Sequence, residues 1–216
     1  MKLLVAIPAY DGTVHVETAR SLLNEQAAGS SLGIELQTVF LPGCSLITMA
    51  RNQAAAKFLE SDADKLVFID SDVSWEVGSI LKLAARPVDF VGGAYRLKQE
   101  LEAYPVGWLD KPELHAVNGL LEVENVPGGF CCLTRDVFAK LKEALPRPYG
   151  HYEFEGQAYW HSPYMNGRLY GEDAAFCHDW RSIGGEVWLD PELNLTHHAG
   201  ATAYKGHIGQ WLKTRN

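Results

Sequence analysis

The sequence predicts an α/β fold, a single domain with a mainly parallel central sheet flanked by helices. Short apolar strands alternate with helical segments through the first half of the chain. This alternation is typical of a parallel sheet with helices on both faces, whose ligands bind at the carboxyl ends of the strands. The length of 216 residues fits one medium domain, which we expect to span residues 1–216.

Apolar runs that end at Pro, Gly or acidic residues predict four buried strands in the first half. They are expected at residues 3–7, 34–41, 66–69 and 89–93. Apolar positions at helical spacing predict helices at about 14–27, 47–59 and 75–85, the last capped by Ser74. This order of strands and helices supports the parallel sheet.

The second half is less regular. Strands are expected at 120–126, 187–189 and 193–198, helices at 135–144 and 171–183, and a tight turn at 126–130. Residues 146–170 combine many aromatic side chains with Gly and Pro and show little periodicity. A segment of this length is too long for a simple connection and is typical of a binding loop.

Composition excludes several classes of protein. The hydrophobic fraction of 47% and charged fraction of 21% are those of an ordered globular chain. No apolar run approaches the roughly 18 to 20 residues of a membrane span. The 4 cysteines form no C-x-x-C pair, which argues against a disulfide framework or structural zinc site and favours a cytoplasmic protein. The net charge of -8 disfavours an extended nucleic-acid surface, although a single nucleotide can still bind.

Two acidic residues follow the third expected strand directly. The run Val67-Phe68-Ile69 leads into Asp70-Ser71-Asp72. Removing two like charges from water costs several kcal/mol per ion unless a cation or hydrogen bonds compensate for it. Acidic residues also end strands and cap helices, so the pair has a structural interpretation as well. At the open end of a buried strand, the two carboxylates are suited to a divalent cation.

The same spacing occurs once more, at Asp62 and Asp64. These two residues lie in a polar stretch that predicts a solvated loop. The position of the pair after a buried strand, and not its spacing alone, therefore identifies Asp70 and Asp72 as the candidate site.

Several segments resemble glycosyltransferases of the GT-A fold, especially those of family 2. In chain order they are Pro8-Ala9-Tyr10, Ala50-Arg51-Asn52, residues 68–72, Gly171-Glu172-Asp173, residues 189–192 and His198-Ala199-Gly200. The resemblance implies a Rossmann-like GT-A domain with a nucleotide-binding half, 1–95, and an acceptor-binding half, 96–216. It also implies a nucleoside-diphosphate sugar donor, expected to be UDP-linked, and an acceptor with a hydroxyl group.

The resemblance implies a metal ion at the aspartate pair. Asp72 would bind it directly, and Asp70 would contact the ribose or reach the metal through water. The histidine two residues before a glycine, His198, would complete the metal site. Because strand alternation points His197 and His198 to opposite faces, only one of them is expected to bind. Oxygen ligands with one imidazole suit Mn²⁺, or Mg²⁺.

The donor is expected to meet the first loop and the residues around the aspartate pair. Pro8, Ala9, Tyr10 and Asp11 would read the base and ribose, while Arg51 would pair with base or phosphate. Ser71 belongs to the same surface. Gly128 and Gly129 would lie near the donor sugar, where small residues permit close backbone approach. These residues also have a structural interpretation, in which residues 8–11 form a turn that ends the strand and Arg51 is a solvated cation on a helix.

Glu172 and Asp173 open a helix, where acids are also common as caps or dipole partners. In inverting members of the resembled family the second acid of this pair deprotonates the acceptor, so Asp173 is the candidate general base. The aromatic side chains of 146–170 could stack on a sugar, pack in the core or form an interface. The Q-x-x-R-W sequence of polymerising relatives is absent, which argues against processive synthesis.

The leading hypothesis is therefore a metal-dependent transfer of one sugar, with inversion preferred. A nucleotidylyltransferase shares the same architecture but usually opens with a glycine-rich basic loop, whereas residues 8–12 contain no Lys or Arg. A catalytically inactive module that binds nucleotide-sugars is the third hypothesis. Asp70, Asp72, Asp173 and His198 occur together in the chain, which disfavours it.

Overall fold

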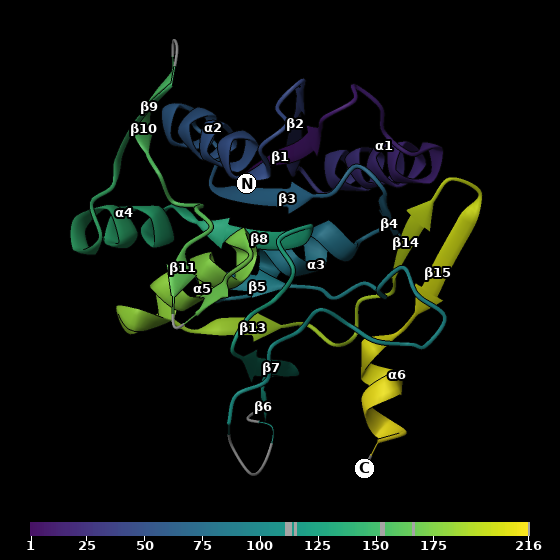
Figure 1. Ribbon diagram of the computed structural model, residues 1–216. Coiled ribbons are helices and arrows are strands. Elements are labelled where there is room, and N and C mark those ends of the chain that lie inside the picture. Colours follow the sequence, from purple (N-terminus) through teal and green to yellow (C-terminus); the bar gives the residue numbers. More distant parts are fainter. Residues whose placement is uncertain (111–113, 115, 152–153, 166, 216) are drawn as a thin grey trace.

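The computed structural model describes residues 1–110, 114, 116–151, 154–165 and 167–215. An eight-stranded sheet of order β2-β1-β3-β8-β5-β13-β7-β6 runs through the centre of the molecule (Figure 1). Its strands are β1 (Lys2–Ala9), β2 (Glu35–Pro42), β3 (Lys65–Ile69), β5 (Phe90–Gly92), β6 (Ala116–Val117), β7 (Leu120–Val123), β8 (Phe130–Thr134) and β13 (Val187–Leu189). The helices are α1 (Val16–Ser31), α2 (Ile47–Glu60), α3 (Ser79–Ala85), α4 (Arg135–Ala144), α5 (Glu172–Ser182) and α6 (Ile208–Lys213).

The strands of this sheet run mostly in one direction, which confirms the predicted fold class. β1 is parallel to β2 and β3, and β5 is parallel to β13. β8 is antiparallel to both β3 and β5, and β7 is antiparallel to β13. The sequence prediction missed β8, because the glycines before it signalled only a turn. Since β8 is reversed, it begins at the edge of the sheet where β3 and β5 end.

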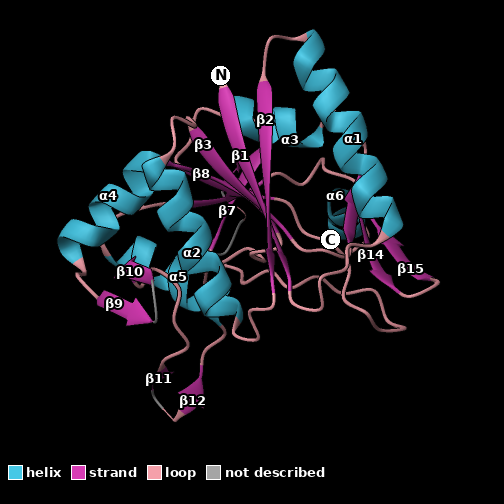
Figure 2. Ribbon diagram, turned by 90° about the horizontal axis from the view of Figure 1, so that it is seen from above, coloured by secondary structure: helices cyan, strands magenta, loops and turns pink. Residues whose placement is uncertain are grey.

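Both faces of the sheet are buried, because alternate residues of each central strand point to opposite sides. Leu66 and Phe68 pack in one cluster with α2, α4 and α5, and Val67 and Ile69 pack in the other with α1 and α3. Figure 2 shows these two groups of helices on opposite sides of the sheet. The near-continuous apolar runs of β1 and β3 are thus explained by burial on both faces.

Three of the five predicted helices agree closely with the structure. The helix expected at about 14–27 corresponds to α1, which ends later, at Ser31, and the fifth is wrong. α2, α4 and α5 lie within two residues of their predicted bounds. The predicted helix 75–85 with a Ser74 cap is wrong: residues Val73–Trp75 form strand β4, and α3 begins only at Ser79 after Gly78. The buried Glu25 of α1 causes this start, because its carboxylate accepts hydrogen bonds from the backbone amides of Gly78 and Leu81 at 2.7 and 2.9 Å.

A second, three-stranded sheet lies beside the end of β3. Its order is β15-β14-β4, with β14 at Leu195–Ala199 and β15 at Thr202–Gly206. The strand expected at 193–198 corresponds to β14, while β15 and α6 were not predicted. Because β4 follows Asp72 directly, the pairing of β14 with β4 brings the C-terminal histidines to the aspartate pair.

Residues 146–170 contain two short hairpins, β9 (Pro148–His151) with β10 (Phe154–Gln157) and β11 (Tyr164–Met165) with β12 (Arg168–Leu169). Figure 2 shows both hairpins projecting from the sheet layer beside α2 and α5. Among the described residues, no helix has the length and apolar character needed to cross a membrane.

Candidate active site

The aspartate pair lies at the carboxyl end of the central strand β3. The backbone amide of Asp70 donates to the carbonyl of Gly129 at 2.9 Å, which continues the β3–β8 ladder beyond Ile69. The backbone amide of His198 donates to the carbonyl of Asp72 at 2.8 Å, at the start of the second sheet. Asp70 is therefore attached to the central sheet and Asp72 to the smaller one.

Asp70 is held by two other side chains. Tyr95, which follows β5, donates its hydroxyl proton to Oδ2 of Asp70 at 2.8 Å, and Nη2 of Arg51 lies 3.4 Å from Oδ1. Burial and the neighbouring Asp70 charge raise the pKa of Tyr95 well above its usual value, so this hydroxyl remains a donor. Both carboxylate oxygens of Asp70 thus have protein partners.

Arg51 is an interior residue, with only 4% of its side chain exposed. Its Nη1 lies 3.0 Å from Oε1 of Glu172, although the pair is not aligned as a hydrogen bond, and its Nε is buried with no hydrogen-bond partner among the described residues. Burial lowers the pKa of Arg51, but Asp70 and Glu172 outweigh that effect and raise it. The guanidinium therefore stays charged and fixes two carboxylates, while its contact with a base or phosphate stays a prediction.

Gly128 and Gly129 lie directly against this network. A β-carbon on residue 128 would fall 2.0 Å from Nη1 of Arg51, and one on residue 129 would fall 2.0 Å from Oδ2 of Asp70. The sequence predicted close backbone approach at these glycines, with a donor sugar as the neighbour. The structure shows that the site's own charged side chains already require both glycines.

The two acids of α5 have different surroundings. Glu172 pairs with Arg51, whereas Asp173 accepts hydrogen bonds from the backbone amides of Ala174 at 2.8 Å and Gly128 at 3.4 Å. The amide of Gly128 therefore links Asp173 to the turn before β8. This contact brings Asp173, Gly128, Arg51 and Asp70 into one group.

Asp72 faces two basic side chains. Nζ of Lys98 lies 2.5 Å from Oδ2, and Nε2 of His197 lies 3.4 Å from Oδ1. Burial raises the pKa of Asp72, but the interactions with His197 and Lys98 outweigh it and lower the pKa to about 2. Asp72 is therefore ionised and carries a cationic group on one oxygen.

The structure places His197, and not the predicted His198, beside Asp72. His198 lies on the other face of β14, where its Nε2 is 2.8 Å from the Ser74 hydroxyl and its ring stacks on His15 at 4.1 Å. Burial and the neighbouring His15 lower the pKa of His198. The two histidines do face opposite sides, as strand alternation predicted. Metal binding by His198 stays a prediction, and its ring nitrogen already has a partner away from the aspartates.

The first loop begins where β1 ends. Ala9 is the last residue of the strand. The carbonyl of Tyr10 accepts a hydrogen bond from the backbone amide of Gly43 at 3.0 Å. The Asp11 carboxylate accepts two hydrogen bonds, from the backbone amide and the hydroxyl of Thr13. The backbone amide of His15 donates to the carbonyl of Ser71 at 2.8 Å, which joins this loop to the aspartate pair. The Tyr10 side chain is 66% exposed. Pro8 and its neighbours thus border the site, and their contact with a base or ribose stays a prediction.

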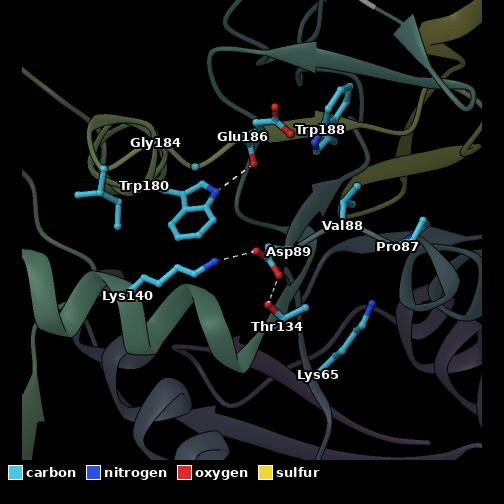
Figure 3. A pocket seen from close by; sticks show the side chains of 12 residues that line it. Lys65, Pro87, Val88, Asp89, Thr134, Lys140, Trp180, Gly184, Glu186 and Trp188 are labelled. Carbon is cyan, nitrogen blue, oxygen red and sulfur yellow. Dashed lines mark hydrogen bonds and ion pairs between the residues drawn. The ribbon is translucent and has the colours of Figure 1, made fainter.

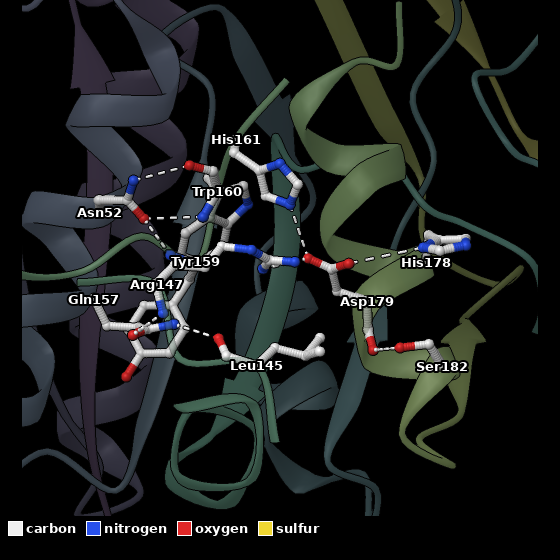
Figure 4. A network of polar contacts seen from close by, with 10 residues as sticks. All are labelled: Asn52, Leu145, Arg147, Gln157, Tyr159, Trp160, His161, His178, Asp179 and Ser182. Atoms are coloured by element: carbon white, nitrogen blue, oxygen red, sulfur yellow. Dashed lines mark hydrogen bonds and ion pairs between the residues drawn. The ribbon is translucent and has the colours of Figure 1, made fainter. Parts of the chain in front are cut away.

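Part of the aromatic segment packs in the core. Trp160 stacks on Phe176 at 4.3 Å, and Tyr159 is equally buried. Figure 4 shows how the Asn52 side chain holds this turn, because it accepts hydrogen bonds from the amides of Tyr159 and Trp160 and donates to the Trp160 carbonyl. These two rings are therefore unavailable to an acceptor. Tyr152 lies outside the described residues, as does the side chain of Phe154, whereas Tyr164 is exposed.

The sequence prediction missed Tyr95 and Lys98. Both lie in the loop after β5, which ends at the same edge of the sheet as β3. The rule that ligands bind at the carboxyl ends of parallel strands marks this loop as a candidate. No charge pattern within the loop distinguishes Lys98 from the other basic residues of the chain.

A separate pocket of about 580 Å³ lies at the opposite edge of the sheet, near the amino ends of β3 and β5 (Figure 3). Several of its polar groups are paired with one another. Lys140 contacts Asp89, Thr134 donates to Asp89, and the Trp180 indole donates to the Glu186 carbonyl. The aspartate pair is not among the residues that line it.

No protein-family model and no curated protein matches the chain. Among solved structures, A197 from STIV has a TM-score of 0.62 at 22% identity, with 96% of this chain and 95% of that protein covered. GalNAc-T7 with UDP, GalNAc and Mn²⁺ has a TM-score of 0.51 at 12% identity, with 91% of this chain and 43% of that protein covered. A mutant of Drosophila β1,4-galactosyltransferase 7 with manganese, UDP-Gal and xylobiose has a TM-score of 0.51 at 13% identity. The match covers 98% of this chain and 73% of that protein.

Similarity at these identities is a similarity of fold. The chain has a Rossmann-like α/β fold of the GT-A type, shared with transferases whose structures contain a nucleotide and manganese.

Proposed function

We propose that this chain is a glycosyltransferase that moves one sugar from a UDP-linked donor to a hydroxyl acceptor, with a divalent cation and with inversion at the sugar. The observation that carries the proposal is that the two aspartates have different side-chain partners. Asp70 is tied to Arg51 and Tyr95, while Asp72 faces His197 and Lys98 on a more open side. Asp70 would contact the ribose, and Asp72 would hold the cation.

The surroundings of His197 fit a cation beside Asp72. Nδ1 of His197 lies 3.0 Å from the Arg96 carbonyl, an acceptor, so Nδ1 carries a proton. In the neutral ring, Nε2 then presents a lone pair to Oδ1 of Asp72 at 3.4 Å. Two lone pairs that face each other require a proton or a metal ion between them. The pair thus supplies one carboxylate oxygen and one imidazole nitrogen, a donor set that Mn²⁺ accepts.

Two protein ligands are enough for such an ion only if the substrate contributes others. Among the described residues, no group of three or more His, Cys, Asp or Glu is arranged to hold a metal. Mg²⁺-type ions are commonly bound through one or two carboxylates, waters and the phosphates of the substrate. We therefore expect the ion to bind together with the diphosphate, where it would act as a Lewis acid toward the leaving group.

Asp173 is proposed as the general base. As the acceptor oxygen forms its bond to the anomeric carbon, the bond from that carbon to the diphosphate breaks and the electron pair leaves with UDP. The proton of the acceptor hydroxyl passes to a carboxylate oxygen of Asp173. Glu172 is less suited to be the general base, because its carboxylate neutralises the buried Arg51. It instead orients Arg51, which in turn positions Asp70.

The test is a panel of nucleotide-sugars with and without Mn²⁺. We expect slow release of UDP from one UDP-sugar without acceptor, and Mn²⁺-dependent binding of UDP by calorimetry. The matching ligand should also raise the unfolding temperature by mass action. Failure of both UDP release and Mn²⁺-dependent UDP binding would overturn the proposal. Release of pyrophosphate from UTP and a sugar phosphate would instead identify a nucleotidylyltransferase.

A further inference from the structure

We propose that Lys98 is a donor-binding residue, whose ammonium group pairs with Asp72 in the free protein and moves to the diphosphate of the bound nucleotide-sugar. The inference rests on the proposed function and adds a second cationic group to the site. The ammonium group would stabilise the negative charge that the leaving diphosphate gains as the bond to the sugar breaks.

The position of Lys98 on the Asp72 carboxylate supports this role. Its Nζ contacts Oδ2, whereas His197 faces Oδ1. A cation held between Asp72 and His197 would therefore lie on one side of the carboxylate and Lys98 on the other. A diphosphate that binds such a cation comes within reach of the flexible lysine side chain, which ends in a compact point charge with three donors.

Exposure separates Lys98 from the other basic side chains near the aspartates. The Lys98 and Asp72 side chains are 35% and 34% exposed, so a ligand can reach the ammonium group. Arg51 is buried. The guanidinium of Arg96 already donates to the carbonyls of Gln99 and Glu100 in its own loop. Lys98 is thus the basic residue of this group that can exchange a protein partner for a phosphate.

The loop that carries Lys98 is held in place on both sides of it. The amide of Leu97 donates to the carbonyl of Ala103 at 2.9 Å, and the Arg96 carbonyl contacts Nδ1 of His197. Two residues before Leu97, Tyr95 binds Asp70. The loop backbone therefore presents Lys98 to the site in a fixed position, and only the side chain has to move.

The experiment compares Lys98→Met, which keeps most of the length of the side chain without its charge, with Lys98→Arg, which keeps the charge. Lys140→Met is the matched control, because Lys140 also pairs with an aspartate, Asp89 at 3.4 Å, but at the opposite edge of the sheet. Calorimetry measures the binding of UDP with Mn²⁺, of UDP with a chelator, and of Mn²⁺ alone.

With Lys98→Met we expect UDP to bind about 10- to 100-fold more weakly, as for the loss of a charge-assisted hydrogen bond. Binding of Mn²⁺ alone should be retained or become tighter, because a competing cation leaves Asp72. Lys98→Arg should recover most of the UDP affinity, and Lys140→Met should match the wild type.

The outcomes separate this inference from the proposed function. If the wild type binds UDP with Mn²⁺ and Lys98→Met binds it equally well, the inference is wrong and the function stands. If Lys98→Met binds UDP weakly only because it no longer binds Mn²⁺, Lys98 is an Asp72 partner alone and the inference is also wrong. If the wild type binds no UDP at all, the proposed function fails.

Discussion

Arg51 occupies the space beside Gly128 that a side chain at position 128 would need. A β-carbon there would lie 2.0 Å from Nη1 and 2.5 Å from Cζ of the guanidinium. Arg51 cannot move aside freely, because it is buried and paired with Asp70 and Glu172. The charged network and the glycine turn before β8 therefore depend on each other.

Gly128→Ala should displace Arg51 and lower the free energy of unfolding by about 1–3 kcal/mol, the usual range for overpacking. It should also weaken UDP binding, since Asp70 loses one of its two side-chain partners. Gly150→Ala is the control, because its added β-carbon would meet one atom, of Glu155, at 4.0 Å. Urea denaturation measures both variants, and equal stability of the two would contradict the packing argument.

Asn52 should be essential to the fold and not to the chemistry. Its buried amide group makes hydrogen bonds to the backbone of Tyr159 and Trp160. Asn52→Ala removes the partner of the Trp160 amide and carbonyl and one of the two acceptors of the Tyr159 amide, so we expect a loss of about 2–4 kcal/mol in the free energy of unfolding. Asn194→Ala, which removes one exposed contact with Glu76, should change it by less than about 0.5 kcal/mol. Thermal and urea unfolding test the contrast.

The parts of the fold that were predicted from sequence are those whose signal is local. The strands β1 and β3 are continuous apolar runs because both of their faces are buried. The start of α3 was wrong because Glu25, distant in the chain, binds the amides of Gly78 and Leu81. Strand β8 was missed because it is a reversed strand between β3 and β5, and no local signal shows that insertion.

In the candidate site, too, the features with a local sequence signal were predicted and those that depend on distant contacts were not. The position of Asp70 and Asp72 after β3 followed from the apolar run, and alternation along β14 correctly placed His197 and His198 on opposite faces. Which of the two faces Asp72 depends on how β14 pairs with β4, and that pairing is not visible in the sequence. Lys98 was missed for a similar reason, since its role depends on the path of an irregular loop.

Stability should depend on pH through Asp179. Burial raises the pKa of this carboxyl group, but hydrogen bonds from Arg147 and His161 outweigh it and lower the pKa (Figure 4). A folded-state pKa below the unfolded value of about 3.9 gives stability that is present above that pH and is lost as the pH falls through the folded-state pKa.

Asp179→Asn should therefore be less stable than the wild type near pH 6, with a difference that shrinks below about pH 4. Urea denaturation at a series of pH values measures it. Arg147→Met should reduce the same pH dependence, because it removes one of the two hydrogen bonds that lower the pKa of Asp179. A difference that stays constant from acid to neutral pH would show that Asp179 acts by packing alone.

Asp72→Ala should abolish Mn²⁺-dependent UDP binding and leave the fold intact. Loss of outer partners of a metal ligand already lowers metal affinity by about 10- to 100-fold, so loss of the ligand itself should do at least as much. Asp62→Ala is the control with the same spacing pattern. Its side chain is 68% exposed and pairs with Lys2 at the surface, so calorimetry should show no change in UDP affinity. Equal effects of the two changes would contradict the distinction between the pairs.

Asp173→Asn should separate donor binding from transfer. The amide side chain keeps the size of Asp173, and its one oxygen can still accept from the backbone amide of Ala174, the shorter of the two hydrogen bonds, so UDP affinity should stay near the wild-type value. It cannot take the proton of the acceptor, so kcat for transfer should fall by about 10²- to 10⁴-fold. Calorimetry with UDP and an assay of transfer to the acceptor found in the panel give the two values.

The control for that variant is Asp136→Asn. Asp136 also lies in the first turn of a helix, α4, but that helix follows the carboxyl end of the reversed strand β8, at the opposite edge of the sheet. Both changes remove one negative charge near a helix N-terminus, so any loss through the helix dipole should be common to them. A fall in kcat confined to Asp173→Asn would then reflect its place beside Gly128, and normal turnover of that variant would remove Asp173 as the base.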